Sequence, residues 1–317
     1  MSYRFSRQDG IDVVAGKGLE IAVSRIGAEL IGMTWLRPDA DPVAILWRNG
    51  LVEPPCDGWW RRHAPVLFPI VGGIHDNRSV TSEGVAVHFE GLHGFLRNRS
   101  LEAIKAEQVD DGFLMSYRLV SDEKTLEMFP WDFEVIVGYL ISGTTVTQEL
   151  TVRNTGTRPM PFQIGWHPGI NVPLGSGGKK DCLLRLPEGR VVRMLNDANC
   201  HLTGEALPFE SSGVFEFNER ELELTYMFDV SAVPPADRLV QIEDPRAAAR
   251  VTVSFPDYPH LGVWSDAGAP FICVEPWQGM DDSVVQEPFD RKFGVVILMP
   301  GCAQTRRAAI SVQGTEV

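Results

Sequence analysis

Residues 134–153, EVIVGYLISGTTVTQELTVR, decide the fold class of this chain. Between residues 145 and 153 the apolar side chains fall on even positions, with Gln148 as the exception. A period of two is typical of a strand with one buried face. Ser142-Gly143-Thr144 separates this strand from the apolar run at residues 134–141. A short turn with glycine between two such runs predicts an antiparallel hairpin.

Three more pairs of segments predict hairpins elsewhere in the chain. They are residues 19–23 with 29–35, residues 238–242 with 251–255, and residues 295–298 with 309–312. Glycine or proline stands in the turn of each pair. Helical stripes with a period of 3.6 are scarce, which excludes a doubly wound α/β fold. We therefore predict an all-β fold, a large antiparallel sandwich or barrel.

The chain shows no internal repeat and no Ser- or Pro-rich linker, so we predict a single domain over residues 1–317. The most flexible segment predicted is residues 175–180, GSGGKK. It is too short for a domain boundary, and we expect it to form a surface loop over the functional site.

The composition limits the possible partners and compartments. The formal net charge of −13 argues against nucleic acid or an acidic membrane as a partner, because lysine and arginine are not in excess. The N-terminal segment MSYRFSRQDGIDVVAGKG lacks the apolar core of a signal peptide, and no stretch has the length of a membrane span. We expect a soluble cytoplasmic protein.

The five cysteines are an odd number at wide spacing and include no CxxC pair. This pattern argues against a disulfide framework and a zinc ribbon. The seven histidines show no metal-binding spacing, so we expect no metal.

Two histidines stand out from the other five because of their neighbours. His93 lies between Gly91 and Gly94, and glycine allows the backbone to approach a ligand closely. His167 precedes Pro168, which favours an extended or turn conformation and keeps the imidazole off a regular strand. We interpret both as candidates for acid–base chemistry.

Glu275 lies in the apolar run Phe271-Ile272-Cys273-Val274-Glu275-Pro276-Trp277. A carboxylate in such a run is costly unless it is paired or functional. The alternative is that Glu275 alternates onto the solvent face, but Pro276 follows at once and favours a strand end, where pockets are lined. Tryptophans near the candidates offer flat apolar faces on which sugar rings stack. Core packing explains most tryptophans in a protein. We expect Trp166 and Trp277 to face the ligand, because they adjoin His167 and Glu275.

These motifs together resemble the aldose 1-epimerase (galactose mutarotase) family, and most closely its bacterial mutarotase-related branch. The matching segments occur in the family's order across about residues 20–300. They are Arg62-His63-Ala64-Pro65-Val66-Leu67-Phe68-Pro69-Ile70-Val71-Gly72, His93-Gly94-Phe95 with Arg97, Trp166-His167-Pro168, Leu261-Gly262-Val263-Trp264-Ser265 and Cys273-Val274-Glu275-Pro276-Trp277.

The resemblance implies a large antiparallel β-supersandwich and an activity that needs no cofactor, the interconversion of α and β anomers of an aldose. It also implies residue roles. His167 is the general acid that protonates the ring oxygen, and Glu275 is the base that takes the proton of the anomeric hydroxyl. His93 and Arg62 hold and polarise the sugar, and Arg97 belongs to the same set.

The chain departs from the family pattern in two places. Ser231 stands where relatives have an aspartate that binds sugar hydroxyls, and Asp229 is the candidate substitute. Gly73 replaces the basic residue that usually follows Val71-Gly72 in this branch. Both departures affect the identity of the sugar more than the reaction.

Three other functions remain open. A hexose-6-phosphate 1-epimerase requires an arginine cluster, which Arg62, Arg97 and Arg99 are able to supply. A sugar-binding sensor on the same scaffold is a second alternative, because a fold does not fix a function. A glycoside hydrolase normally needs two facing carboxylates, with Glu275 as one and the Asp281-Asp282 segment, which resembles a polar loop, as the nearest source of the other. The expected partner is a small aldohexose, and the expected assembly is a monomer or a homodimer.

Overall fold

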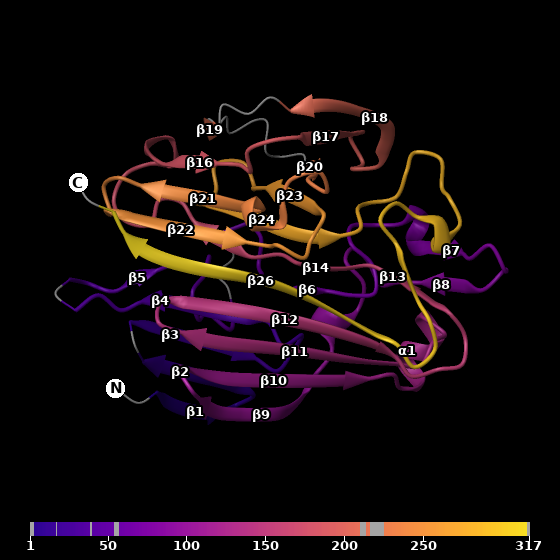
Figure 1. The fold of residues 1–317 in the computed structure, drawn as a ribbon, viewed down its shortest axis with the longest axis horizontal. Helices are drawn as coiled ribbons and strands as arrows, with labels where there is room; N and C mark the ends of the chain where they lie inside the picture. Colours follow the sequence, from indigo (N-terminus) through magenta and orange to yellow (C-terminus); the bar gives the residue numbers. More distant parts are fainter. Residues whose placement is uncertain are drawn as a thin grey trace.

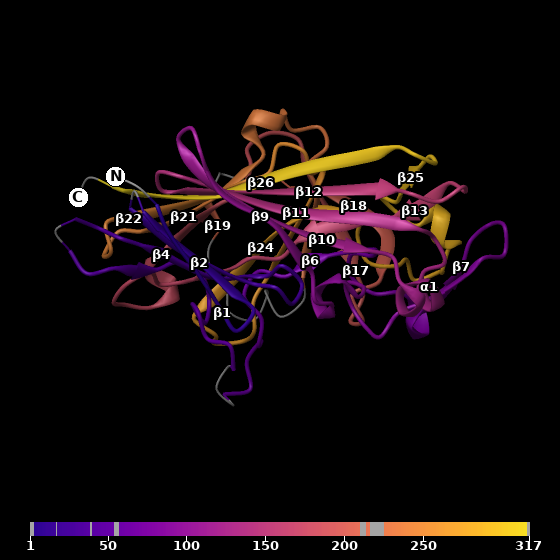
Figure 2. The same ribbon diagram turned by 90° about the horizontal axis from the view of Figure 1, so that it is seen from below.

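The computed structural model describes residues 3–16, 18–38, 40–53, 57–209, 214–215 and 225–315, with residues 214 and 215 described by their backbone only. Within these residues the fold is built almost entirely from antiparallel strands (Figure 1). Seen from below, strands β26, β12 and β11 lie in one layer, with β2, β4 and β24 beneath it (Figure 2). The fold is a large antiparallel β-sandwich.

The largest sheet has nine strands. In spatial order they are β19 (Val214–Phe215), β16 (Leu183–Arg185), β21 (Leu239–Asp244), β22 (Ala249–Ser254), β26 (Ala303–Gly314), β12 (Thr145–Asn154), β11 (Phe133–Ser142), β10 (Gly112–Val120) and β9 (Glu102–Val109).

The second sheet has eight strands and carries the candidate site. Its order is β18 (Leu202–Phe209), β17 (Val191–Asn196), β20 (Tyr226–Asp229), β23 (His260–Trp264), β24 (Phe271–Gln278), β14 (Ile164–Trp166) and β6 (Val66–Leu67), with β15 (Gly169–Asn171) also paired to β24.

The remaining strands form three smaller sheets. They are the five-stranded sheet β1 (Arg4–Gln8), β2 (Ile11–Gly16), β3 (Leu19–Ser24), β4 (Leu30–Trp35) and β5 (Val43–Ala44), the pair β13 (Met160–Phe162) with β25 (Val296–Leu298), and the pair β7 (Arg78–Val80) with β8 (Ala86–His88).

Helices are few and short in the described part of the chain. The α-helix is α1 (Glu123–Met128), and the 3₁₀ turns are η1 (His75–Asn77), η2 (Leu96–Asn98), η3 (Lys179–Asp181), η4 (Pro235–Asp237) and η5 (Phe289–Arg291). Asp122 caps α1 by accepting a hydrogen bond from the amide of Thr125. No helix among the described residues has the length and apolar character to cross a membrane.

Three of the four predicted hairpins are confirmed. Strands β11 and β12 pair through the turn at Gly143, β3 pairs with β4, and β21 pairs with β22. Gln148 is fully buried on the apolar face of β12, and its amide nitrogen lies 3.4 Å from the hydroxyl of Tyr139. The side chain that breaks the apolar alternation is therefore a buried polar residue with a hydrogen-bond partner.

The predicted hairpin at the C-terminus is wrong. Strand β25 pairs with β13, whereas β26 lies between β12 and β22. A strand between two neighbours satisfies its backbone groups on both edges, and this outweighs a local hairpin that leaves one edge unpaired.

One large cluster of buried apolar side chains lies inside the sandwich and draws on strands of every large sheet, from Tyr3 to Val312. Glycines allow close packing on the eight-stranded sheet. A β-carbon built on Gly262 would lie 2.6 Å from the indole ring of Trp277. Trp277 is therefore held against β23 only because residue 262 has no side chain.

We predict that Gly262→Ala lowers the free energy of unfolding by about 1–3 kcal/mol, because the added methyl group overpacks the contact with Trp277. Urea unfolding followed by tryptophan fluorescence measures the change. Gly138→Ala on β11 is the matched control, since its added β-carbon would meet nothing closer than 3.7 Å. Equal destabilisation by both variants would contradict this account.

Candidate active site

Strand pairing places His167 directly opposite Glu275. Gly165 pairs with Trp277 and Gly169 pairs with Cys273, so the register is the same on both sides. In this register His167, midway between the two glycines, is aligned with Glu275, midway between Cys273 and Trp277. Pro168 has no amide hydrogen to continue the ladder, and β14 therefore ends before it and β15 begins after it. The imidazole of His167 lies in this interruption and contacts the carboxylate on β24.

The His167–Glu275 pair is close and buried. His167 Nε2 lies 3.0 Å from Glu275 Oε2, and the two residues are 6% and 1% exposed. Apart from this contact, neither oxygen of Glu275 nor His167 Nδ1 has a hydrogen-bond partner among the described residues. A buried carboxylate without donors is costly, and that cost falls when the adjacent imidazole carries a proton. Glu275 thus does not alternate onto a solvent face.

Aromatic rings fix the position of the His167 imidazole. Trp60 stacks on it with the ring centroids 4.7 Å apart, and Trp264 meets it edge-on at 6.2 Å. These tryptophans take the orienting role that a hydrogen bond to Nδ1 has in many acid–base sites.

His93 lies beside His167 and is held as a neutral ring. Its Nδ1 accepts the amide hydrogen of Gly72 at 3.0 Å, so its free proton is on Nε2. Burial lowers the pKa of His93 well below its ordinary value, and His167 and Arg97 lower it further. The residue has a φ of 65°, so a tight turn points the imidazole into the site.

The two glycines near His93 have different surroundings. A β-carbon on Gly94 would lie 2.4 Å from the carbonyl oxygen of Phe68, whereas one on Gly91 would meet nothing within 4 Å. At Gly94 the close backbone approach is made to the chain itself.

The cavity over this pair has a volume of about 520 Å³. It is lined by Trp60, Arg61, Arg62, Gly72, Leu92, His93, Arg97, His167, Asn199, Cys200, Thr225, Trp264, Glu275, Trp277 and Asp281. Indole faces and several charged groups converge there, which is the usual composition of a site for a small polar ligand.

Arginines form one wall of the cavity. Arg62 donates to Glu29 Oε2 at 3.2 Å and to Asn98 Oδ1 at 2.5 Å. Burial acts to raise the pKa of Glu29, but hydrogen bonds from His63 and the charge of Arg62 outweigh it and leave the pKa lowered. Burial and the charge of Arg62 lower the pKa of Arg97 to about 10. Arg99 lies outside the lining, with its guanidinium over the ring of Phe95, and Arg61 takes its place.

Two residues predicted to bind substrate lie away from the cavity. Trp166 is fully buried, and its indole nitrogen donates to the carbonyl oxygen of Ala64. Asp229 ends β20, where its carboxylate accepts the amide hydrogen of Ser231. Trp166 therefore packs in the core, and Asp229 is not in a position to replace a hydroxyl-binding aspartate.

Other residues line the cavity that the sequence analysis did not propose as sugar-binding residues. Trp60 and Trp264 are two of them. Asp281 also lines it and is only 7% exposed, so it is not part of a polar surface loop. The feature of the sequence that pointed to Asp281 as a cavity residue is its position only four residues after Trp277.

The glycine-rich segment 175–180 does not lie over this cavity. Lys179 instead donates to Ser265 Oγ at 2.6 Å and to the carbonyl oxygen of Ala269 at 3.1 Å. The expectation of a loop over the site is therefore wrong.

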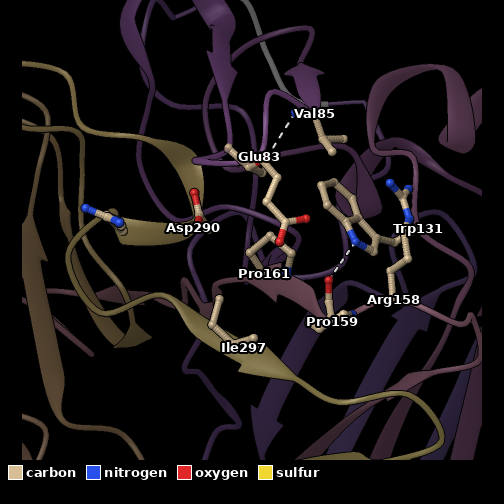
Figure 3. Close-up of a pocket in the computed structure, with 10 residues that line it drawn as sticks. Glu83, Val85, Trp131, Arg158, Pro159, Pro161, Asp290 and Ile297 are labelled. Carbon is tan, nitrogen blue, oxygen red and sulfur yellow. Dashed lines mark hydrogen bonds between the residues drawn. The ribbon is translucent and has the colours of Figure 1, made fainter.

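A second cavity of about 300 Å³ lies elsewhere in the fold (Figure 3). Glu83, Trp131, Arg158 and Asp290 are among its lining residues. Asp290 accepts the amide hydrogen of Ser82 at 2.6 Å, and the indole of Trp131 donates to Pro159 at 2.8 Å. Its lining includes no histidine, so the His167–Glu275 cavity is the better candidate for proton transfer.

His167, Cys273 and Glu275 offer three metal-ligand atoms within 4.8 Å of one another. Burial and the charge of Glu275 raise the pKa of the Cys273 thiol well above its ordinary value. Cys182, Cys200 and Cys302 are free as well, whereas Cys56 lies outside the described residues.

The profile of the family described as Aldose 1-epimerase matches residues 10–311 of this chain. The chain belongs to the aldose 1-epimerase family. The Lactococcus lactis subsp. lactis protein LacX, in its plasmid form, is 28% identical to this family member over 277 residues, which are 84% of this chain and 87% of LacX.

Solved structures share the fold of this aldose 1-epimerase homologue. A galactose mutarotase related enzyme from Lactobacillus acidophilus superposes with a TM-score of 0.82 at 24% identity, covering 96% of this chain and 97% of that one. Galactose 1-epimerase from Lactobacillus acidophilus NCFM superposes with a TM-score of 0.73 at 11% identity and covers 99% of each chain. The likeness confirms the predicted galactose mutarotase-like sandwich.

We predict that the ring of His93 remains mainly neutral, with its proton on Nε2, from pH 8 down to about pH 6.5, where an ordinary histidine is half protonated. The amide of Gly72 occupies Nδ1, and burial opposes a positive charge. Two-dimensional ¹H–¹⁵N NMR of the imidazole nitrogens reports the tautomer at each pH. Protonation of His93 near the ordinary value of about 6.5 would contradict this assignment.

Proposed function

We propose that this protein interconverts the α and β anomers of an unphosphorylated aldohexose, with His167 and Glu275 as its proton-transfer groups. The observation that carries the proposal is the 3.0 Å contact between His167 Nε2 and Glu275 Oε2 on the wall of a cavity lined by indoles. Mutarotation requires a proton acceptor and a proton donor at two oxygens bonded to the same carbon. A contacting acid–base pair has the spacing for this task.

In the proposed reaction, Glu275 takes the proton from the anomeric hydroxyl and His167 delivers a proton to the ring oxygen. The C1–O5 bond then breaks, and the open aldehyde rotates about the C1–C2 bond. Reclosure on the other face reverses both transfers, so the two groups return to their initial states and no cofactor enters the balance. Positioned acid–base groups typically contribute about 10²- to 10⁴-fold each.

The other cavity residues suit the binding of a sugar. His93 presents Nε2–H as a neutral donor. Arg62 and Arg97 line the cavity, and their positive charge would stabilise electron density that develops on the reacting sugar oxygens as the ring opens. Trp277 and Trp264 offer apolar faces to the C–H groups of the ring.

A hexose 6-phosphate is the second candidate substrate, because Arg61, Arg62 and Arg97 line the same wall. Arg62 already donates to Glu29, Asn98 and the carbonyl oxygen of Arg97, whereas Arg97 Nε has no partner among the described residues. Arg61 and Arg97 are therefore the arginines that we assign to a phosphate in this alternative, because both line the cavity.

Glycoside hydrolysis is less well supported. Glu275 and Asp281 both line the cavity, as a pair of carboxylates would in a glycosidase. Glu275, however, is in direct contact with an imidazole, which already supplies the second proton carrier.

We predict that Glu275→Gln lowers kcat for mutarotation about 10²- to 10⁴-fold, because the amide retains the shape of the side chain but cannot accept the proton. Polarimetry of freshly dissolved α-D-glucose and α-D-galactose gives the rate, and saturation-transfer NMR between the two anomeric signals confirms it at equilibrium.

Glu83→Gln in the second cavity is the control and should leave the rate unchanged. Full activity in Glu275→Gln would overturn the assigned base. A silent wild type would instead direct the test to glucose 6-phosphate and then to p-nitrophenyl hexosides.

A further inference from the structure

We infer that the carboxylate of Asp281 accepts a hydrogen bond from a hydroxyl of the sugar and selects which sugar is bound. This inference rests on the proposed function of the same cavity. Glu275 and Asp281 are the two carboxylates that line the cavity among the described residues, and Glu275 is already in contact with His167. Asp281 is therefore the carboxylate left for recognition.

The segment 71–73 holds Asp281 and His93 side by side at the cavity. The amide of Gly72 donates to His93 Nδ1, and the next amide, of Gly73, donates to Asp281 Oδ1 at 2.6 Å. Consecutive backbone amides thus orient a neutral donor and a negatively charged acceptor. Sugar hydroxyls need both kinds of partner, since each is a donor and an acceptor.

Two glycines make room for this carboxylate. A β-carbon on Gly72 would lie 2.2 Å from Asp281 Cγ, and Gly72 has a φ of 65°. A β-carbon on Gly73 would stand 3.7 Å from Asp281 Oδ1. With glycine at both positions, no side chain from this segment covers the carboxylate.

The second oxygen of Asp281 is free to bind a ligand. Within the described residues, the amide of Gly73 is the only hydrogen-bond partner of this side chain, and it contacts Oδ1. Burial raises the pKa of Asp281 to about 6, although the charge of Lys292 opposes the rise. Asp281 is therefore mainly ionised at pH 7.5, and a hydroxyl bound to a charged acceptor in a buried site forms a strong hydrogen bond.

The decisive experiment compares wild type with Asp281→Asn on an active hexose and its 2-, 3-, 4- and 6-deoxy analogues, by saturation-transfer NMR at pH 7.5. The asparagine retains an oxygen for the amide of Gly73 and loses the charge. We expect KM for the parent sugar to rise about 10- to 100-fold with kcat within about 3-fold of wild type. For wild type, removal of one particular hydroxyl should raise KM as much as Asp281→Asn raises it for the parent sugar. For Asp281→Asn, removal of the same hydroxyl should leave KM unchanged.

Asp282→Asn is the matched control. Asp282 is buried next in the chain but does not line the cavity, and its carboxylate accepts hydrogen bonds from the His75 amide and Gln286 Nε2. The KM of Asp282→Asn should equal that of wild type. If Asp281→Asn does not fold, Asp281→Ser serves as the second variant, with melting temperatures measured for all proteins.

Three results would overturn the inference. The first is an unchanged KM in Asp281→Asn. The second is an equal rise in the KM of wild type on every deoxy analogue. The third is a fall in the kcat of Asp281→Asn with no change in its KM. A wild type that turns over no sugar would overturn the proposed function instead, and Kd values from quenching of the cavity tryptophans would then replace KM in the same comparison. Absence of binding by wild type would overturn both.

Discussion

Pro168 cannot donate a hydrogen bond, so the ladder between residues 164–171 and β24 lacks one bond at this position, although the Pro168 carbonyl oxygen still accepts the amide hydrogen of Val274. The chain resolves this constraint by pairing twice, through β14 before the proline and through β15 after it. The register is the same on both sides, which leaves His167 opposite Glu275. The acid–base pair is thus a product of backbone hydrogen bonding, and its position in the sheet is as rigid as the strands that flank it.

Backbone amides also set the charges around this pair. Gly72 fixes the tautomer of His93, Gly73 holds Asp281, and the amides of His63 and Ala64 donate to the Glu29 carboxylate that anchors Arg62. Such donors belong to the fold and do not reorganise when a ligand arrives, which is the condition under which fixed dipoles contribute most to a reaction. The short segments before and after β6 therefore orient several of the charged and polar groups of the cavity.

The relatives differ from this chain more in sequence than in fold. The galactose mutarotase related enzyme of Lactobacillus acidophilus keeps the sandwich at 24% identity. In the present chain, two polar residues that line the cavity, His93 and Asp281, lie in segments outside the strands. Such segments tolerate substitution without loss of the core, so one sandwich is able to present different polar groups at this position.

The sequence by itself determined three of the four predicted hairpins and several residues of the cavity. Apolar and polar side chains alternate along β11 and β12, because one face of these strands is buried and the other is nearer to solvent. The turn between the two strands is short, so the sequence predicts both the strands and their pairing. The motifs that resemble the aldose 1-epimerase family also contained Arg62, His93, Arg97, His167, Glu275 and Trp277, all of which line one cavity.

Tertiary structure alone decided the rest. Strands β14 and β24 are buried along their full length, so no alternation shows that Trp166 points into the core and Trp277 into the cavity. The position of β26 between β12 and β22 depends on pairing with residues about 55 to 165 positions away in the sequence, and a local turn signal does not predict such pairing. Asp281 reaches the cavity only because the distant glycines 72 and 73 leave it space. Sequence spacing reports which side chains are neighbours along the chain, whereas packing decides which of them share a site.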